Sequence, residues 1–574
     1  MLLAAACAPA PEVGVGEVTK VADTGDSRLT VAKSNLKGSV YGTYLAGRFA
    51  ERQNDLASAS ALMLRVLEEN PEDERLRERT FKLTLQAGQI ETSVKLAREL
   101  EKAAVQAPGA ALLLASIDIK AGRYKEAKRR LDSAPDVGLA KYTVPLAKAW
   151  VNVGLKDSEA GLAALDALDK ESGFTILRKL HSGLINDLAG DVAKAEEIYR
   201  SIKDKLSEAP LRIVRAAGAL FERAGRTDEA KALYDTYLEA NPSSLLMQHE
   251  QKRLARGGKV VPIVANPIEG VAEALYNLAS ALLRNRGRAG DVALLYARIA
   301  LVLRPDFPLT QVLIGDILTG NQRHAEAVEI YRGVNSRSPY SWVARLRVAD
   351  GLYELGKIPE AERLLEKMAA GRTKRSDSLV KLGNFRRYKE KYKAAVEAYD
   401  KALARVGEPR EQDWALYYYR GIAHERLKQW DSAEKDFLKA LELKPEQPYV
   451  LNYLGYSWVD QGKNLVRARK MIERAVEQKQ RDGYIVDSMG WALYRLGEYG
   501  DAVKQLERAV QLRAQDPIIS DHLGDAYWRV GRHHEARFQW QRALSLEPEK
   551  SEVEKIEIKL ERGLGKAEVV GSGG

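Results

Sequence analysis

Small, aromatic and polar residues recur along this chain at intervals close to 34 positions. The pattern is clear in "YYYRGIAHERLKQWDSAEKDFLKALELKP" (417–445) and "SDHLGDAYWRVGRHHEARFQWQRALSLEP" (520–548). Glycine occurs at the same place in both stretches, and alanine, a bulky ring, a second alanine and a proline follow at matching distances. This spacing predicts two helices per unit, with small residues where the helices cross and proline after the second helix.

Alignment on the central small residue of each unit extends the pattern over most of the chain. The aligned residues are Ala59, Ser93, Ala127, Ala160, Ala195, Ala230, Ala293, Ala327, Ala361, Ala395, Ala433, Ala468, Ala502 and Ala536. The spacing is regular except for a long interval between Ala230 and Ala293. Fourteen helical pairs are therefore expected, with one interruption.

The repeat resembles the tetratricopeptide pattern. That resemblance implies an all-α solenoid in which helix pairs stack into a right-handed superhelix with a concave groove. Glycine inside a helix costs about 1 kcal/mol relative to alanine, so a recurrent glycine indicates a close helix contact that requires it. Glycines such as Gly462 and Gly531 are expected in the turn after each first helix.

The interruption and the chain ends predict the domain organisation. The segment "GGKVVPIVANPIEG" breaks the helical pattern with glycine, proline and β-branched residues. The predicted parts are a lipobox-like N-terminus and flexible tether at 1–36, a six-repeat array at 37–256, an interrupting loop at 257–270, an eight-repeat array at 271–548, and a capping helix with a disordered tail at 549–574. The loop is interpreted either as a tolerated insertion or as a hinge or partner contact.

Composition supports a folded chain with a basic excess. The chain has 574 residues and a formal net charge of +10. A basic run at 372–393 could attract an acidic partner, although a solvated helical face explains it equally simply. No nucleic-acid recognition motif accompanies this run, so no nucleic-acid partner is predicted. No apolar stretch is long enough to span a membrane as a helix.

The short sequence motifs do not support catalysis or metal binding. His249-Glu250, His424-Glu425 and His534-Glu535 each lack the second histidine that a zinc-protease helix requires four positions after the first. The stretch "GLYELGK" (351–357) has the glycine and lysine spacing of a phosphate loop, but Ile358 replaces the hydroxyl that would bind Mg²⁺. We therefore predict no catalytic residue, no cofactor and no metal ligand.

The lone cysteine, Cys7, follows a short apolar run in "MLLAAACAPAPEVG". This context resembles a bacterial lipobox, in which lipid is attached to the cysteine and anchors the protein to a membrane. Only six residues precede Cys7, fewer than a signal peptide needs. The alternatives are a start assigned too far downstream and an ordinary N-terminus in the cytoplasm.

Partner binding is expected on the first helices, which line the groove in this architecture. The predicted groove residues are Tyr418, Arg426, Asn452, Tyr456, Asp460, Asp487, Trp491, Tyr494, Arg495, Asp521, Asp525, Trp528 and Arg529. Aromatic side chains among arginines and carboxylates are typical of protein-recognition hot spots. Packing between adjacent helix pairs is the alternative role for Trp491 and Trp528.

The C-terminal block "LNYLGYSWVDQGKNLVRARKMIERAV" (451–476), with the repeats after it, resembles bacterial tetratricopeptide-repeat outer-membrane lipoproteins. The resemblance implies a non-enzymatic adaptor on the periplasmic face of the outer membrane. The implied partners are a carboxyl-terminal processing protease, which is a periplasmic serine protease, and its peptidoglycan hydrolase substrates. The alternatives are an assembly factor for a pilus, secretion or exopolysaccharide-export machine, and a soluble cytoplasmic regulatory subunit.

Overall fold

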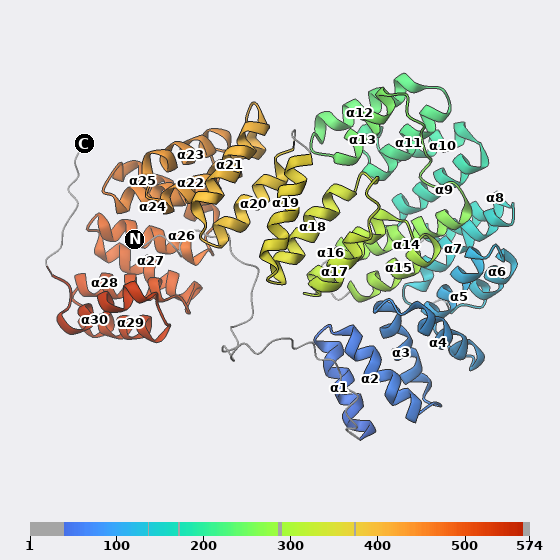
Figure 1. Ribbon diagram of the computed structural model, residues 1–574, viewed down its shortest axis with the longest axis horizontal. Helices are drawn as coiled ribbons and strands as arrows, with labels where there is room; N and C mark the ends of the chain where they lie inside the picture. The colour runs from blue at the N-terminus through green and yellow to red at the C-terminus, as the bar shows by residue number, and fades with distance from the viewer. Residues whose placement is uncertain (1–38, 136, 170–172, 285–289, 372–374, 566–574) are drawn as a thin grey trace. The chain divides into compact units, whose positions relative to one another are not determined.

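The described part of the chain is entirely helical. The computed structural model describes residues 39–135, 137–169, 173–284, 290–371 and 375–565 (Figure 1). These residues form thirty α-helices and three short 3-10 helices, and no strand occurs among them. The all-α prediction is confirmed. Cys7, the predicted tether and the glycine-rich tail lie outside the described residues.

The helices group into two compact units that divide within α19, after Leu364. The first unit, described from residue 39 to 364, contains α1 (Val40–Arg52), α2 (Leu56–Glu69), α3 (Glu74–Gln86), α4 (Ile90–Lys102), α5 (Pro108–Lys120), α6 (Tyr124–Asp132), α7 (Ala140–Gly154), α8 (Ser158–Ala164), α9 (Thr175–Ala189), α10 (Val192–Arg200), α11 (Leu211–Arg223), α12 (Thr227–Ala240), α13 (Leu245–Ala255), α14 (Pro267–Arg284), α15 (Gly290–Leu303), α16 (Pro308–Gly320), α17 (His324–Arg332), α18 (Ser341–Glu354) and the first half of α19 (Ile358–Gly371).

The second unit, described from residue 365 to 565, contains the second half of α19 and eleven further helices. They are α20 (Asp377–Tyr388), α21 (Tyr392–Val406), α22 (Trp414–Arg426), α23 (Trp430–Leu443), α24 (Pro448–Asp460), α25 (Leu465–Gln478), α26 (Gly483–Arg495), α27 (Tyr499–Leu512), α28 (Pro517–Arg529), α29 (His533–Ser545) and α30 (Lys550–Arg562). Apart from α13 and α30, the helices form fourteen consecutive pairs, the number that the sequence predicts.

The recurrent glycines lie where a ring from the second helix of a pair meets the first helix. A Cβ placed on Gly218 would lie 2.2 Å from Tyr234, and one on Gly524 would lie 2.5 Å from Trp540. The pairs Gly183–Tyr199, Gly315–Tyr331, Gly383–Tyr399 and Gly421–Phe437 repeat this contact. Each ring is buried against the bare glycine backbone, which explains why the sequence accepts the helix-propensity cost.

Eight of the turns between paired helices contain a glycine with positive φ, for example Gly531 at 82°. Other turns have a side chain in the same left-handed region, including Glu390 at 57° and Lys428 at 61°. Because this region is unfavourable for residues with a Cβ, these turns carry backbone strain that glycine would relieve.

In the first unit, the array returns onto its own inner helices. Helix α14 packs on α7 and α9, and α15 packs on α3 and α5, in addition to their neighbours along the chain (Figure 1). The helices α3, α5, α7 and α9 are all first helices of their pairs, so α14 and α15 cover the side that lines the groove in this architecture. The concave face of the early repeats is therefore occupied by the chain itself.

Specific contacts fix this arrangement across long sequence separations. Gly270 of α14 lies so close to Trp150 of α7 that a Cβ there would be 2.1 Å from the indole. The Gln86 side-chain amide donates to the Asp291 carbonyl at 3.0 Å. The Lys120 ammonium donates to the Val302 carbonyl at 2.6 Å.

The segment between α13 and α14 lies inside the first unit rather than at the boundary between the units. Ile263 and Val264 of this segment are buried, whereas Val261 is 63% exposed. The segment therefore combines core contacts with one exposed apolar side chain.

Candidate protein-binding site

The predicted groove residues lie on four first helices of the second unit: α22, α24, α26 and α28. They differ in their surroundings. Tyr418 is buried in the hydrophobic core and packs edge-on against Tyr453, with ring centroids 6.0 Å apart. Asn452 and Tyr456 of α24 are also buried.

Charged residues of the predicted set pair along and between helices. Arg495 of α26 reaches Asp460 of α24, with a nitrogen–oxygen distance of 3.3 Å. Arg426 of α22 lies 3.6 Å from the carboxylate of its neighbour Glu425. Both arginines are partly exposed, so both ion pairs remain accessible to solvent. Only the Arg495–Asp460 pair links two helices, because Arg426 and Glu425 both belong to α22.

Trp491 is the centre of an aromatic stack on α26 and α28. Its ring lies 4.8 Å from Tyr494 at an interplanar angle of 10°, and 4.2 Å from the His522 ring at 17°. The indole Nε1 is buried and has no hydrogen-bond partner among the described residues. Arg529 adjoins the stack, because its Nε donates to the Tyr494 hydroxyl at 3.2 Å.

His522 also forms an ion pair with a buried carboxylate. Its Nδ1 lies 3.0 Å from Asp487 Oδ1, and both side chains are almost fully buried. Burial alone would lower the pKa of His522, but Asp487 reverses this effect and the pKa is raised above its ordinary value. A positive charge on His522 is thus favoured beside Trp491.

The carboxylates of α28 bind the terminal helix α30. Lys559 of α30 lies 2.7 Å from Asp521 and 2.8 Å from Asp525. Asp525 also accepts a hydrogen bond from the Trp540 indole at 2.9 Å. Burial, together with the neighbouring Asp521 charge, raises the pKa of Asp525 to about 6.

The residues after α30 contact the remaining two members of the predicted set. The backbone of Gly563 packs against the Trp528 ring so closely that a Cβ would be 1.9 Å from it. Arg529 donates to the Gly565 carbonyl at 2.5 Å. Asp521, Asp525, Trp528 and Arg529 therefore bind the end of the chain itself, and Trp491 and Tyr494 are the more available part of the predicted set.

Two members of this cluster are absent from the sequence-based set. His522 is not among the predicted groove residues, yet it stacks on Trp491 and pairs with Asp487. Lys559 belongs to the predicted capping helix, and its partners lie 34 and 38 positions earlier. The two aspartates at 521 and 525 on either side of His522 were the available signal for His522, whereas no local pattern indicated Lys559.

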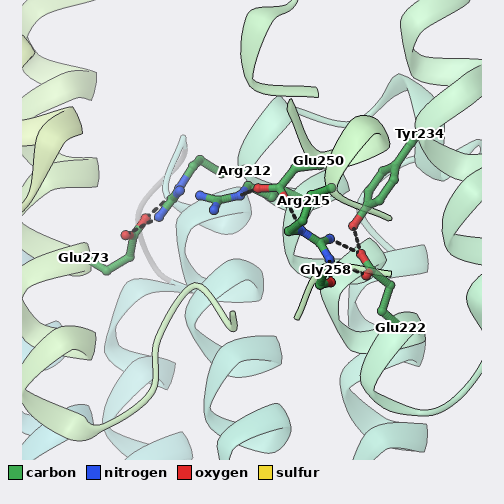
Figure 2. Close-up of polar contacts among 8 residues, drawn as sticks. Arg212, Arg215, Glu222, Tyr234, Glu250, Gly258 and Glu273 are labelled. Carbon is green, nitrogen blue, oxygen red and sulfur yellow. Dashed lines mark hydrogen bonds and ion pairs between the residues drawn. The ribbon is translucent and has the colours of Figure 1, made fainter. Parts of the chain in front are cut away.

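In the first unit, ion pairs with buried carboxylates join the inner helix α11 to α13 and α14. Arg212 of α11 donates from Nε to Glu273 of α14 at 2.9 Å, and Glu273 is fully buried (Figure 2). Arg215 donates to Glu250 of α13 at 2.7 Å (Figure 2). Tyr234 donates to Glu222 at 2.8 Å, so the polar network continues to α12 (Figure 2).

The first unit also has a buried histidine whose chemistry contrasts with that of His522. The Trp150 indole donates to His181 Nδ1 at 3.0 Å. Burial lowers the pKa of His181 to about 4, so the ring stays neutral near neutral pH. One histidine is thus held neutral in the interior and the other is stabilised as a cation.

Two other kinds of site, a metal centre and a membrane-spanning helix, are not found among the described residues. No group of three or more histidine, cysteine, aspartate or glutamate side chains there is arranged to hold a metal ion. Among the same residues, no helix is long and apolar enough to cross a membrane.

Comparison with known sequences agrees with the repeat geometry. Residues 214–244 and 374–448 match family models described as tetratricopeptide repeats, and residues 490–531 match one described as a TPR repeat. The fold is that of a tetratricopeptide-repeat solenoid. In this solenoid, the aromatic stack around Trp491 lies on the first helices of the last two pairs.

Relatives match only part of the chain. Over 198 residues, it is 28% identical to the TPR repeat-containing protein PA4667 of Pseudomonas aeruginosa, covering 33% of this chain and 31% of that protein. Over 148 residues, it is 27% identical to the BBSome complex member BBS4 of Bos taurus, covering 26% of this chain and 27% of that protein. The matches thus span less than a third of either relative.

Among solved structures, the crystal structure of the APC/C hetero-tetramer Cut9-Hcn1 aligns over 92% of this chain and 97% of that chain. The sequence identity is 15% and the TM-score is 0.38.

Proposed function

We propose that this protein is a scaffold that binds a partner protein along the inner helices of its second unit. The observation that carries the proposal is the environment of Trp491. Its ring is partly exposed between Tyr494 and His522, and its buried indole Nε1 has no partner among the described residues. An aromatic anchor with a spare donor and adjacent arginines is typical of a binding hot spot.

The difference between the two units supports the same location. In the first unit, α14 and α15 cover the inner helices α3, α5, α7 and α9. In the second unit, the described contacts of α22, α24 and α26 are chiefly with their neighbours in the array. The proposal therefore assigns partner binding to the second unit.

The finer proposal concerns the partner and the location in the cell. We propose that the protein is anchored through lipid on Cys7 at the periplasmic face of the outer membrane. There it would bind a carboxyl-terminal processing protease and bring peptidoglycan hydrolase substrates to it. Support comes from the lipobox-like context of Cys7 and from the resemblance of the C-terminal repeats. Tethering would raise the effective concentration of the bound proteins.

The binding site is tested with the purified chain and a purified protease of this class. Trp491→Ala should weaken binding at least tenfold, because hot-spot aromatics contribute about 2 kcal/mol or more. Trp491→Phe should restore part of the loss, since it keeps the ring and removes only the donor. Phe538→Ala is the control, because Phe538 is 62% exposed on α29, a second helix. Equal binding by Trp491→Ala and Phe538→Ala would refute the site.

The anchor is tested separately by fatty-acid labelling in bacterial cells. Incorporation of label that disappears in Cys7→Ala supports the lipid anchor. Absence of label on a chain produced from its natural start would refute it. Neither result depends on the Trp491 experiment.

A further inference from the structure

A cavity of about 310 Å³ lies in the first unit, where the segment between α13 and α14 meets the beginnings of three helices. One wall is formed by Val261, Pro262 and Ile263. The others include Arg212 and Arg215 in α11, the start of α16 and Tyr340 before α18. This volume is in the range of small-ligand sites.

The cavity wall is strongly basic. Arg212, Arg215, Arg304 and Arg337 line it, and Asp306 is the single carboxylate in the lining. Asp306 accepts a hydrogen bond from the Asn335 amide at 3.2 Å. The charge that faces the cavity is therefore predominantly positive.

The carboxylates that neutralise the partly buried arginines Arg212 and Arg215 are not part of the cavity lining. Glu273 binds Nε and Nη2 of Arg212, and Glu250 binds Nε of Arg215 (Figure 2). A guanidinium has five N–H donors, so both arginines retain donors beyond these bonds. Arg304 lies 3.6 Å from Glu269, and Arg337 is exposed with no ion pair to a described residue.

Three helix N-termini add to the positive potential. Helices α11, α16 and α18 begin at the cavity, and none has a side-chain hydrogen bond capping its first turn. The partial positive charge of each N-terminus favours an anion. Burial raises the pKa of Tyr340, so its hydroxyl stays protonated and can donate.

The edge of the cavity is apolar. Val261 is 63% exposed, and Pro262, Pro308 and Leu309 also belong to the lining. A free inorganic anion would make no use of this surface, whereas a peptide can place an apolar side chain there beside its charged group. Arginine donors and a planar carboxylate also match in geometry.

We infer that this cavity binds a peptide carboxylate, with the arginines and helix N-termini holding the charge and Val261 contacting the adjacent apolar residue. The carboxylate is either the C-terminus of a peptide or an aspartate or glutamate side chain. This inference concerns the first unit and does not depend on partner binding at Trp491.

The test is titration calorimetry of the full chain with three acetylated pentapeptides. The first ends in two leucines with a free C-terminus, the second is its amide, and the third is the amide carrying one glutamate. Arg304→Gln with Arg337→Gln should weaken carboxylate binding about tenfold, because charge-assisted hydrogen bonds are lost. Arg337→Gln alone should cause a smaller loss without touching a described ion pair.

Arg481→Gln is the matched control. Arg481 is exposed in the turn before α26, has no ion pair with a described residue and lies in the second unit. Its replacement should leave the affinity within twofold. Circular dichroism of each variant checks folding, and the affinity of the unaltered chain should also fall at high salt.

Each outcome decides the inference. Binding of the free acid but not its amide supports a C-terminal carboxylate, and binding of the glutamate-containing amide supports a side-chain carboxylate. The inference is overturned if the amide without a carboxylate binds as well as the free acid. It also fails if no peptide binds at several millimolar, or if the double variant matches Arg481→Gln.

Discussion

The two units are built from the same helical pair and use its inner face differently. In the first unit, α14 and α15 pack on the inner helices, and buried pairs such as Arg212–Glu273 fix them there. In the second unit, the inner helices present stacked rings and ion pairs instead, with α30 bound at the last pair. The repeat therefore specifies the pairing of helices, whereas single side chains determine whether the inner face becomes core or surface.

The largest expected effect on stability comes from breaking the Arg212–Glu273 ion pair, which joins α11 to α14 in the first unit. Glu273→Ala leaves Arg212 buried without its carboxylate, which should lower the free energy of unfolding by about 3–5 kcal/mol. Hydrogen exchange should rise in α11 and α14 and stay unchanged in α26 and α28. Lys504→Ala is the control, since its exposed pair with Asp501 should contribute little to the free energy of unfolding. A loss confined to the second unit would contradict the assignment.

The contact between a helical glycine and a ring of the paired helix should affect the free energy of unfolding in either unit. Gly218→Ala gains up to about 1 kcal/mol in helix propensity, but its Cβ would meet Tyr234 at 2.2 Å. Overpacking of this kind costs about 1–3 kcal/mol, so a net destabilisation is expected in urea unfolding. Gly500→Ala is the control with the opposite expected sign. Gly500 is helical, and no atom lies within 4 Å of the position that the added Cβ would occupy. That variant should be more stable by up to about 1 kcal/mol.

Acidification should act on the second unit through Asp525. Its folded pKa of about 6 lies above the ordinary aspartate pKa of 3.8, so between these pH values the folded state holds a proton that the unfolded chain has lost. The contribution of Asp525 to stability is therefore present at low pH and diminishes as pH rises from about 4 to about 6. The groups facing it are Asp521, His522 and Lys559.

The measurement compares the unaltered chain with Asp525→Asn. As pH falls from about 6 to about 4, the unaltered chain should gain stability relative to the variant, by an amount on the order of 1 kcal/mol. Urea unfolding at several pH values provides the comparison. A constant difference across this range would show that Asp525 does not titrate there.

The smallest effect concerns the turns, which the two units share. Lys428 has φ 61° where most turns of the array have glycine. Lys428→Gly should raise stability by about 0.5–1 kcal/mol, because relief of the left-handed strain exceeds the entropic cost of glycine. The reverse change, Gly531→Lys, should lower stability, since Gly531 has φ 82°. Thermal unfolding of both variants checks the sign.

Local features of the fold were predictable from the sequence. The spacing of Gly218, Ala230 and Tyr234 indicates a helix crossing, and that contact occurs. The closure of the first unit could not be predicted in the same way, because Trp150 and Gly270 are 120 positions apart and Gly270 ends the segment that the sequence predicts as an interrupting loop. Contacts between distant repeats depend on the curvature of the whole array, which small rotations at every pair determine.

The candidate site was predictable in outline. Position within the repeat placed Trp491 and Tyr494 on a first helix, and the structure brings them together with His522. The contacts of Asp521 and Asp525 with Lys559 were not predictable, because they depend on how α30 docks on α28. The partner-binding role of the thirteen residues stays a prediction.

The return of α15 onto α3 gives the first unit an unusual folding problem for a repeat array. Gln86 contacts the backbone of Asp291, 205 positions later. Most solenoid contacts are local and can form as each repeat emerges during synthesis. Here α3 remains uncovered until Asp291, 205 positions after Gln86, has been made. The apolar surface around Trp150 is exposed until α14 has been made, which makes the nascent first unit a natural substrate for chaperones.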